Sequence, residues 1–129
     1  MWVQQMKILL VLLSSLLLSA CETPREEKDR IVSPSKEFDA IIATTSPGAI
    51  GPNGFHIHIV LHGNALDEFP VFTATHVQSI NVKWMGDRRL SISAERADVF
   101  ASRIQKRIMR NGEEVVISVW FDVARQGRD

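Results

Sequence analysis

The sequence predicts a mainly β protein, folded as a small antiparallel sheet meander or sandwich. Apolar and polar residues alternate with a period of two in several segments, which is typical of half-buried strands. Turn-forming residues separate these segments, as at Asn111-Gly112. With 129 residues, 45% of them hydrophobic, the chain is long enough for one domain with its own core. We predict this globular domain over residues 37–125.

Charge and cysteine content exclude some classes of protein. Fifteen basic and fifteen acidic residues give a formal net charge of zero, which argues against a dedicated nucleic-acid-binding protein. The single cysteine excludes an internal disulfide framework and a zinc site built from several cysteines. We therefore expect no nucleic acid among the partners.

The first strands are predicted over Phe38–Thr45 and over FHIHIVLH. Alternation divides the second segment between two faces. One face takes Phe55, Ile57, Ile59 and Leu61, and the other takes His56, His58, Val60 and His62.

The segments SINVKWM and RLSISA predict a hairpin. Its apolar side chains share one face if Trp84 faces Leu90, Val82 faces Ile92 and Ile80 faces Ala94. A three-residue connection, Gly86-Asp87-Arg88, fits this register and implies a bulge. We interpret Trp84 and Trp120 as core or core-edge residues.

Residues 97–109 allow two predictions. A stripe of apolar residues at helical spacing predicts one short helix; it comprises Ala97, Phe100, Ala101, Ile104 and Ile108. Asn111-Gly112 instead indicates a hairpin turn, which pairs Ile108 with Val115 and Ile104 with Val119. We favour the hairpin, whose second strand continues through VVISVWFDV, and keep the helix as the alternative.

Residues 1–20 have the features of an export signal. Lys7 precedes an apolar stretch from Ile8 to Ala20, which as a helix spans about 20 Å, short of the roughly 30 Å hydrocarbon core of a membrane. The stretch ends in Leu18-Ser19-Ala20-Cys21, which resembles the lipobox of bacterial lipoprotein signal peptides. The resemblance implies cleavage before Cys21, a diacylglyceryl group on its thiol and acylation, for example with palmitate, of the new N-terminus.

A lipid anchor accounts for a cysteine that has no disulfide partner in this chain, and two or more acyl chains make the anchor durable. Glu22 stands where, in the lipoproteins that the chain resembles, Asp favours the inner membrane. We therefore expect the outer membrane, facing the periplasm, with the outer leaflet of the inner membrane or the cell surface as alternatives. The charged residues 21–36 are predicted to comprise the lipidated cysteine and a flexible tether.

The globular part is similar to a family of small bacterial proteins known only as a domain of unknown function. The similarity lies in SPSKEFDAIIATTSPGAIGPNGFHIHIV, in VKWMGDRRLSIS and in ADVF with the strand after it. It implies a compact β fold and brings no catalytic residues with it.

A pair of histidines is the first candidate for a chemical site. His56 and His58 project from one face about 6.7 Å apart, a separation that two imidazoles can close on one metal ion. His76 is the candidate third ligand, with Asp39 or Asp67 behind it. The competing interpretation is the polar face of a half-buried sheet, without a metal.

A glycine-rich loop is the second candidate, as a binding loop, through Gly48, Gly51, Asn53 and Gly54. It lacks the Lys-Ser/Thr of phosphate-binding loops. The competing prediction is a connection between strands with a turn at Asn53-Gly54.

These features predict a lipid-anchored cell-envelope protein that is a binding, accessory or structural module. We do not expect an enzyme, because the chain has no G-x-S-x-G motif and no cysteine besides Cys21. The expected partners are the membrane, through Cys21, and an envelope protein or polymer. The alternative is a periplasmic module that binds a divalent transition metal through His56 and His58; otherwise we expect no cofactor.

Overall fold

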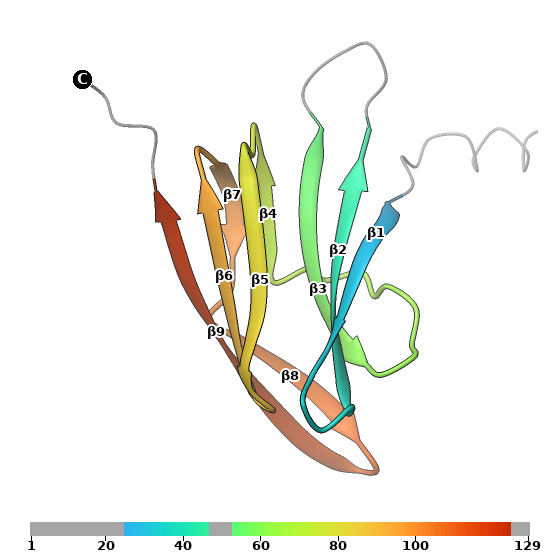
Figure 1. The fold of residues 1–129 in the computed structure, drawn as a ribbon. Helices are drawn as coiled ribbons and strands as arrows, with labels where there is room; N and C mark the ends of the chain where they lie inside the picture. The colour runs from blue at the N-terminus through green and yellow to red at the C-terminus, as the bar shows by residue number, and fades with distance from the viewer. Residues whose placement is uncertain (1–24, 47–52, 125–129) are drawn as a thin grey trace, which may run out of the picture.

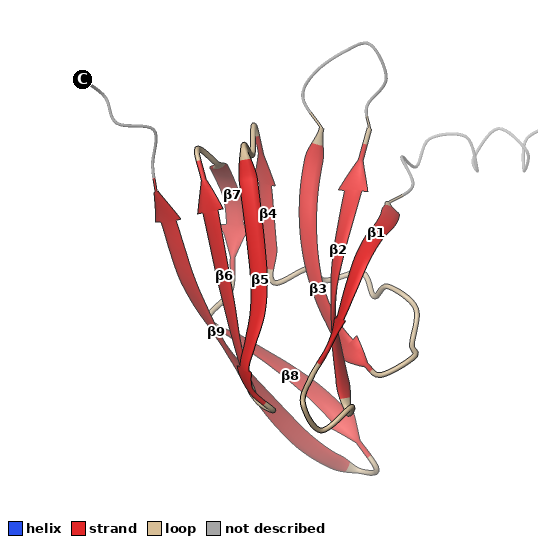
Figure 2. Ribbon diagram, viewed as in Figure 1, coloured by secondary structure: helices blue, strands red, loops and turns tan. Residues whose placement is uncertain are grey.

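The computed structural model describes residues 25–46 and 53–124, and within those ranges it contains nine strands and no helix (Figure 2). The first sheet holds five antiparallel strands, in the spatial order β1 (Glu26–Val32), β2 (Phe38–Thr45), β3 (Gly54–Leu61), β4 (Phe72–Thr75) and β7 (Asp98–Ser102). The second holds four, in the order β5 (Ser79–Gly86), β6 (Arg89–Glu95), β9 (Glu113–Ala124) and β8 (Gln105–Arg110). The mainly β fold predicted from alternation is confirmed.

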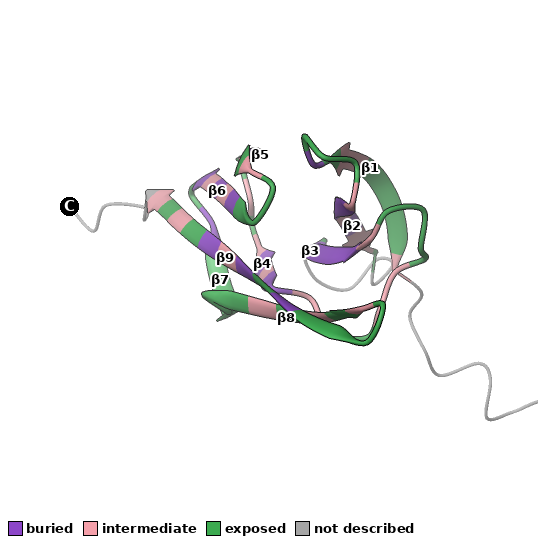
Figure 3. Ribbon diagram, turned by 90° about the horizontal axis from the view of Figure 1, so that it is seen from below, coloured by how far each residue is buried: buried purple, intermediate pink, exposed green. Residues whose placement is uncertain are grey.

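The two sheets enclose one hydrophobic core (Figure 1). Its fully buried side chains come from both sheets and include Phe38, Ile57, Ile59, Leu90, Ile92 and Ile117. Strands β1 and β5 lie next to each other at one side of the sandwich (Figure 3). There the indole Nε1 of Trp84 donates a hydrogen bond to the carbonyl of Ile31, 2.8 Å away, and joins the two sheets.

The register predicted for the hairpin of β5 and β6 is confirmed. Trp84 faces Leu90, Val82 faces Ile92 and Ile80 faces Ala94. The register shifts between Trp84 and Gly86, and Gly86 pairs with Arg89. The expected bulge is therefore present, but the three-residue connection is wrong, since Gly86 still pairs and only Asp87 and Arg88 form the turn.

The short helix kept as the alternative over 97–109 is wrong, because most of these residues belong to the strands β7 and β8. The hairpin predicted at Asn111-Gly112 is present, and it pairs Ile108 with Val115. Asn111 and Gly112 both have positive φ, 49° and 79°, as a tight two-residue hairpin turn requires. In β8, Ile108 packs on the core and Lys106 and Arg110 on the same face are half-buried, whereas Ile104, just before the strand, is 72% exposed.

One pair of neighbouring strands in the second sheet is parallel. Strand β9 lies beside β6 in parallel register, from Arg89 opposite Ser118 to Glu95 opposite Ala124. Parallel neighbours need a long crossover. Here the crossover passes through β7, which belongs to the other sheet, and then through β8. The sheet is therefore mixed, where the sequence predicted antiparallel pairing.

The tether predicted over 21–36 is wrong in its second part, since Glu26–Val32 forms the edge strand β1. Its backbone pairs with β2, and Ile31 packs against the core. Arg30 adds ion pairs with Glu27 and with Asp39. A strand whose backbone pairs in this way needs few apolar side chains of its own.

Within the ranges that the structure describes, no helix is long and apolar enough to cross a membrane. The export signal, Cys21, Gly48 and Gly51 lie outside those ranges.

Candidate functional site

The outward face of β2 and β3 is buried, although it lies opposite the core. Alternation places six buried side chains there: Asp39, Ile41, Ala43, His56, His58 and Val60. Buried polar groups need hydrogen-bond partners. Among residues 25–46 and 53–124, every buried side-chain nitrogen and oxygen has one.

His58 is fully buried and hydrogen-bonded at both ring nitrogens. Its Nδ1 donates to Oδ1 of Asp67, 2.8 Å away, in the loop after β3, and Nη1 of Arg25 lies 3.4 Å from Nε2. Burial lowers the pKa of His58, against the opposing effect of Asp67. A neutral ring with its proton on Nδ1 fits this set of partners.

Asp67 joins three parts of the fold. It accepts from His58 on β3 and, at Oδ2, from Nζ of Lys106 on β8, which also donates to the carbonyl of Phe69 at 3.0 Å. Burial raises the pKa of Asp67, but the hydrogen bonds from Lys106 and His58 outweigh it, so the pKa is lowered overall. The carboxylate therefore stays ionised and holds its loop against both sheets.

His56 lies between two threonine hydroxyls, each 3.2 Å from a ring nitrogen: Thr45 at Nε2 and Thr73 at Nδ1. Burial, with smaller contributions from the charge of Arg25 and from His58, lowers the pKa of His56 to about 4. The ring is therefore neutral at neutral pH, donating from one nitrogen and accepting at the other.

The predicted histidine metal site is not assembled in the described residues. The rings of His56 and His58 are close, with centroids 6.4 Å apart, but all four of their nitrogens already have neighbours. His76 is exposed at the end of β4, where its Nδ1 lies 2.9 Å from Oδ2 of Asp98. No group of three or more His, Cys, Asp or Glu side chains that could hold a metal occurs in the part of the chain described.

Asp39, the other acidic residue predicted near this site, is fully buried and serves a second network. Its carboxylate lies 2.7 Å from Nη1 of Arg30 and 2.7 Å from Nδ1 of His62, and it accepts from the backbone N–H of Gly63 at 3.0 Å. Burial raises the pKa of Asp39, and these hydrogen bonds bring it below its usual value. The network connects β1, β2 and the start of the loop after β3.

Gly54, one of the predicted loop residues, is the first residue of β3 and is buried. A Cβ atom there would lie 2.5 Å from Oγ1 of Thr45 and 3.2 Å from Nε2 of His56. The glycine thus makes room for the hydrogen bond between those two side chains. Asn53 is exposed just before the strand.

The outward face of the second sheet carries an exposed tryptophan among serines, charged side chains and the exposed Val116 and Met85. Trp120 on β9 is 65% exposed, while Val119 before it is buried in the core. The prediction that Trp120 belongs to the core or its edge is therefore wrong, because the residue is out of phase with the buried positions of its strand. Its neighbour in the register is Ser91 on β6.

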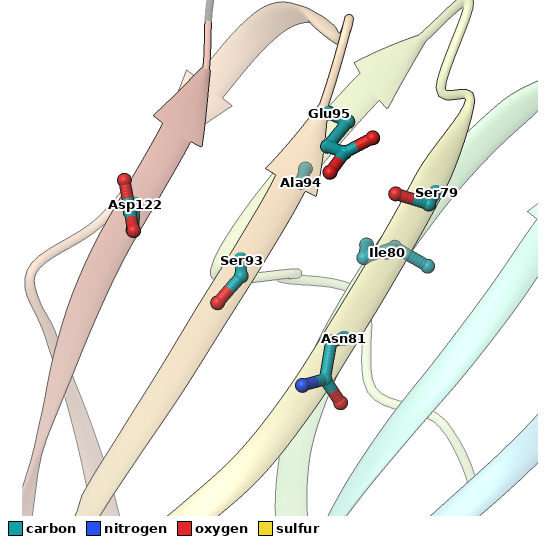
Figure 4. A pocket seen from close by; sticks show the side chains of 7 residues that line it. All are labelled: Ser79, Ile80, Asn81, Ser93, Ala94, Glu95 and Asp122. Atoms are coloured by element: carbon teal, nitrogen blue, oxygen red, sulfur yellow. The ribbon is translucent and has the colours of Figure 1, made fainter.

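A hollow of about 260 Å³ lies on this face beyond Trp120 (Figure 4). Its polar lining comes from three neighbouring strands: Ser79 and Asn81 of β5, Ser93 and Glu95 of β6, and Asp122 of β9. Ile80 and Ala94 also line it, although their side chains face the core. Asp122 lies two residues after Trp120 on the same strand, so the indole is on the same face as the hollow, about 7 Å along β9 from Asp122.

We define the Trp120 face as the outward surface of β5, β6 and β9 around the indole. It comprises Trp120 with Ser91, Ser118, Lys83 and Arg89 around it, and Ser79, Asn81, Ser93, Glu95 and Asp122 at the hollow. Sequence reasoning did not single it out, although the period-two pattern of VVISVWFDV places Trp120 opposite the apolar positions. The crossing of β9 to the side of β6 could not be read from the sequence.

No family model matches the chain, and comparison with curated proteins and with solved structures gives no match either. The similarity to small bacterial proteins of unknown function stays a prediction.

Proposed function

We propose that this chain is a lipid-anchored cell-envelope protein whose β-sandwich acts as a binding module. The observation that carries the proposal is the Trp120 face, where a large indole lies 65% exposed beside a polar hollow. Sites that bind ligands combine an apolar surface with a few polar groups that fix orientation. By contrast, the buried histidines, aspartates and Lys106 all serve to hold loops and strands in place.

The sequence Leu18-Ser19-Ala20-Cys21 supports the anchor. Since β1 begins at Glu26, residues 22–25 alone separate the lipidated cysteine from the sandwich. Such a connection reaches at most about 18 Å when fully extended. The domain would therefore stay next to the membrane. Because the residue after Cys21 is Glu22 and not Asp, we propose that this is the outer membrane, with the domain facing the periplasm.

The start of β1 lies at the same end of the sandwich as the start of β5 and the ends of β6 and β9 (Figure 1). Ser79, Glu95 and Asp122 are located toward that end. The hollow would consequently lie at the end of the domain nearest the anchor, within reach of envelope components close to the membrane.

Two measurements test the proposal. Palmitate labelling and fractionation of cells should find the wild-type chain labelled and in the outer-membrane fraction, and Cys21→Ser unlabelled and absent from that fraction. Label that persists in Cys21→Ser, or a native chain that still begins at Met1 in the cytosol, would rule out the anchor.

The second measurement concerns binding. The Cys21→Ser chain without residues 1–20, purified without lipid, should sediment with washed bacterial envelope fragments in a saturable manner. If it stays in the supernatant at every envelope concentration, the sandwich is not a binding module for envelope material.

A further inference from the structure

We propose that a second hollow, at the end of the sandwich nearest the anchor, binds the zwitterionic headgroup of a phospholipid, a phosphate joined to a positively charged amine. The hollow measures about 530 Å³ and is lined by His76, Gln78, Arg96 and Asp98. We call it the His76 hollow. The inference rests on the proposed function in one respect, that the lipid at Cys21 holds the domain against a membrane.

Two short connections at the same end of the sandwich build the His76 hollow. They are residues 76–78, between β4 and β5, and residues 96–97, between β6 and β7. Each connection is fixed by an apolar side chain: Ala97 is buried in the hydrophobic core, and Val77 packs against that core. Connections that are held in this way present their polar side chains in a fixed arrangement, which lowers the entropic cost of binding a ligand.

The backbone at the hollow adopts a rare conformation at two positions. His76 and Arg96 have positive φ, 54° and 51°, which residues with a side chain seldom adopt. Such conformations persist only where the surrounding structure holds them, and they cluster at ligand sites. Here the N–H of Gln78 donates to the carbonyl of Glu95, 3.1 Å away, and joins the two connections. The strained residues are thus two of those whose side chains line the hollow.

The charges of the lining are those that a zwitterion requires. The guanidinium of Arg96 carries N–H donors in a planar fork that suits a phosphate, and no ion pair among the described residues uses it. The carboxylate of Asp98 has Oδ2 2.9 Å from Nδ1 of His76 and is 69% exposed, so it is open to a cation as well. The Gln78 amide adds a neutral donor and acceptor.

Ligands with one sign of charge fit the hollow less well. A bare phosphate would bind Arg96 but also face the carboxylate of Asp98, and Glu95, the residue before Arg96, adds further negative charge. A bare amine would face the guanidinium. An uncharged ligand would displace water from both charges without replacing its hydrogen bonds. A phosphate joined to an amine pairs with both charges at once.

The position of the hollow identifies the membrane as the source of the headgroup. Figure 1 shows the ends of β4 and β6 and the starts of β5 and β7 at the end of the sandwich where β1 begins. Residues 22–25, which join Cys21 to β1, reach at most about 18 Å. So short a tether gives an effective concentration of the order of millimolar, so a Kd of about 1 mM is enough for occupancy. A protein free in solution lacks this advantage.

The test is an NMR titration of the lipidated chain in a nonionic detergent, which brings neither phosphate nor charged amine. The probes are glycerophosphoethanolamine, the soluble form of a zwitterionic headgroup, and its two charged parts, glycerol 3-phosphate and ethanolamine. The imidazole signals of His76, assigned with His76→Gln, report binding. We expect glycerophosphoethanolamine to bind with a Kd of the order of 1–10 mM, and each part at least about fivefold more weakly.

Variants locate the site. Arg96→Gln and Asp98→Asn each remove one charge of the hollow, and each should weaken binding of glycerophosphoethanolamine about fivefold or more. Arg107→Gln is the matched control, because Arg107 is an exposed arginine of β8 with Glu114 as its acidic neighbour. It should leave the Kd within about twofold. Urea unfolding checks that each variant is folded.

A second measurement uses membranes. The lipidated chain is inserted into vesicles of phosphatidylethanolamine and phosphatidylcholine, both zwitterionic, or into vesicles of anionic phosphatidylglycerol. Hydrogen exchange at residues 76–78 and 96–98 should slow in the zwitterionic vesicles relative to detergent, and less so in the anionic ones. Arg96→Gln should lose this protection.

The inference is overturned if no His76 signal moves below about 50 mM probe, or if either charged part binds as tightly as glycerophosphoethanolamine. Folded Arg96→Gln or Asp98→Asn that binds as the wild type does overturns it too. Equal hydrogen exchange in vesicles and in detergent would leave the hollow to a protein or a soluble ligand and also overturn it.

The titration does not depend on the anchor, so the two proposals fail separately. A chain that is labelled with palmitate but fails the titration keeps the anchor and loses the headgroup site. A chain that binds glycerophosphoethanolamine but carries no lipid at Cys21 keeps the ligand chemistry of the hollow and loses the anchor.

Discussion

The buried imidazole of His58 and the carboxylate of Asp67 form a hydrogen bond of 2.8 Å that connects β3 to the loop after it. The same carboxylate accepts from Lys106 of β8, in the second sheet. One aspartate thus holds together a loop and strands from both sheets. Because His58 is fully buried, its ring would have no water to replace a lost partner.

Asp67→Ala should therefore destabilise the protein. The change leaves the His58 Nδ1–H without an acceptor in a buried place and removes the ion pair of Lys106, at a cost of about 2 kcal/mol in the free energy of unfolding. Urea unfolding measures this value. Glu68→Ala is the matched control, since Glu68 is an exposed carboxylate of the same loop, and it should change stability by less than about 0.5 kcal/mol. Equal stability of the two variants would contradict the structural role of Asp67.

Acid should destabilise the fold through His56. Burial lowers its pKa from 6.5 to about 4 in the folded protein, so the unfolded chain binds the proton more readily. The contribution is fully present above pH 6.5 and is lost as the pH falls toward 4, by up to about 1.4 kcal/mol per pH unit and about 3 kcal/mol in total. The buried His58, whose pKa is also lowered, adds to the loss in the same direction.

The measurement is the free energy of unfolding between pH 7 and pH 4 for wild type and for His56→Gln. The variant should have a clearly flatter profile in this window. His76→Gln, which removes an exposed histidine instead of a buried one, is the matched control. If the two variants have the same slope, burial of His56 is not the source of the acid sensitivity.

Trp84→Phe should destabilise the protein by weakening the contact between the two sheets at β1 and β5. It removes the indole donor to the carbonyl of Ile31 and some buried surface, and we expect a loss of about 1–2 kcal/mol in urea unfolding. Trp120→Phe makes the same chemical change at an exposed position and should cost less than about 0.5 kcal/mol. A larger loss for Trp120→Phe would mean that its indole packs on the sandwich.

The sequence predicted those parts of the fold that local patterns encode. Alternation placed the strands around Ile57, Leu90 and Ile117 and set the register of β5 on β6, because shifting a strand by one residue turns its apolar side chains outward. Alternation did not reveal β1, because its residues Glu26–Val32 are mostly charged and the strand is held by backbone pairing with the edge of β2. No local pattern states which strand becomes a neighbour, so the parallel pair of β6 and β9 was not predicted.

The candidate site was predicted only in part, for the same reason. His56 and His58 do share one face, as their spacing indicates, but Thr73, Asp67 and Lys106 reach them from distant parts of the chain. Those partners turn a possible pair of metal ligands into buried, hydrogen-bonded side chains. The Trp120 face likewise depends on β5, β6 and β9 lying side by side, which is a property of the sheet order.

Gly54 should tolerate no side chain. A Cβ atom at this position would lie 2.5 Å from Oγ1 of Thr45, closer than real Cβ contacts, and Thr45 is a β-branched residue whose hydroxyl is held by His56. Gly54→Ala should therefore push Thr45 away from His56 and cost about 1–3 kcal/mol in the free energy of unfolding.

Gly86→Ala is the matched control for Gly54→Ala. Gly86 also lies in a strand, but nothing is within 4 Å of the position of its Cβ. Alanine there should be neutral within about 0.5 kcal/mol or slightly stabilising, because it restricts the unfolded chain. The double variant Gly54→Ala with Thr45→Ala should recover part of the loss, since it removes the clashing hydroxyl. If Gly54→Ala is as stable as Gly86→Ala, the close packing of Gly54, Thr45 and His56 does not exist in solution.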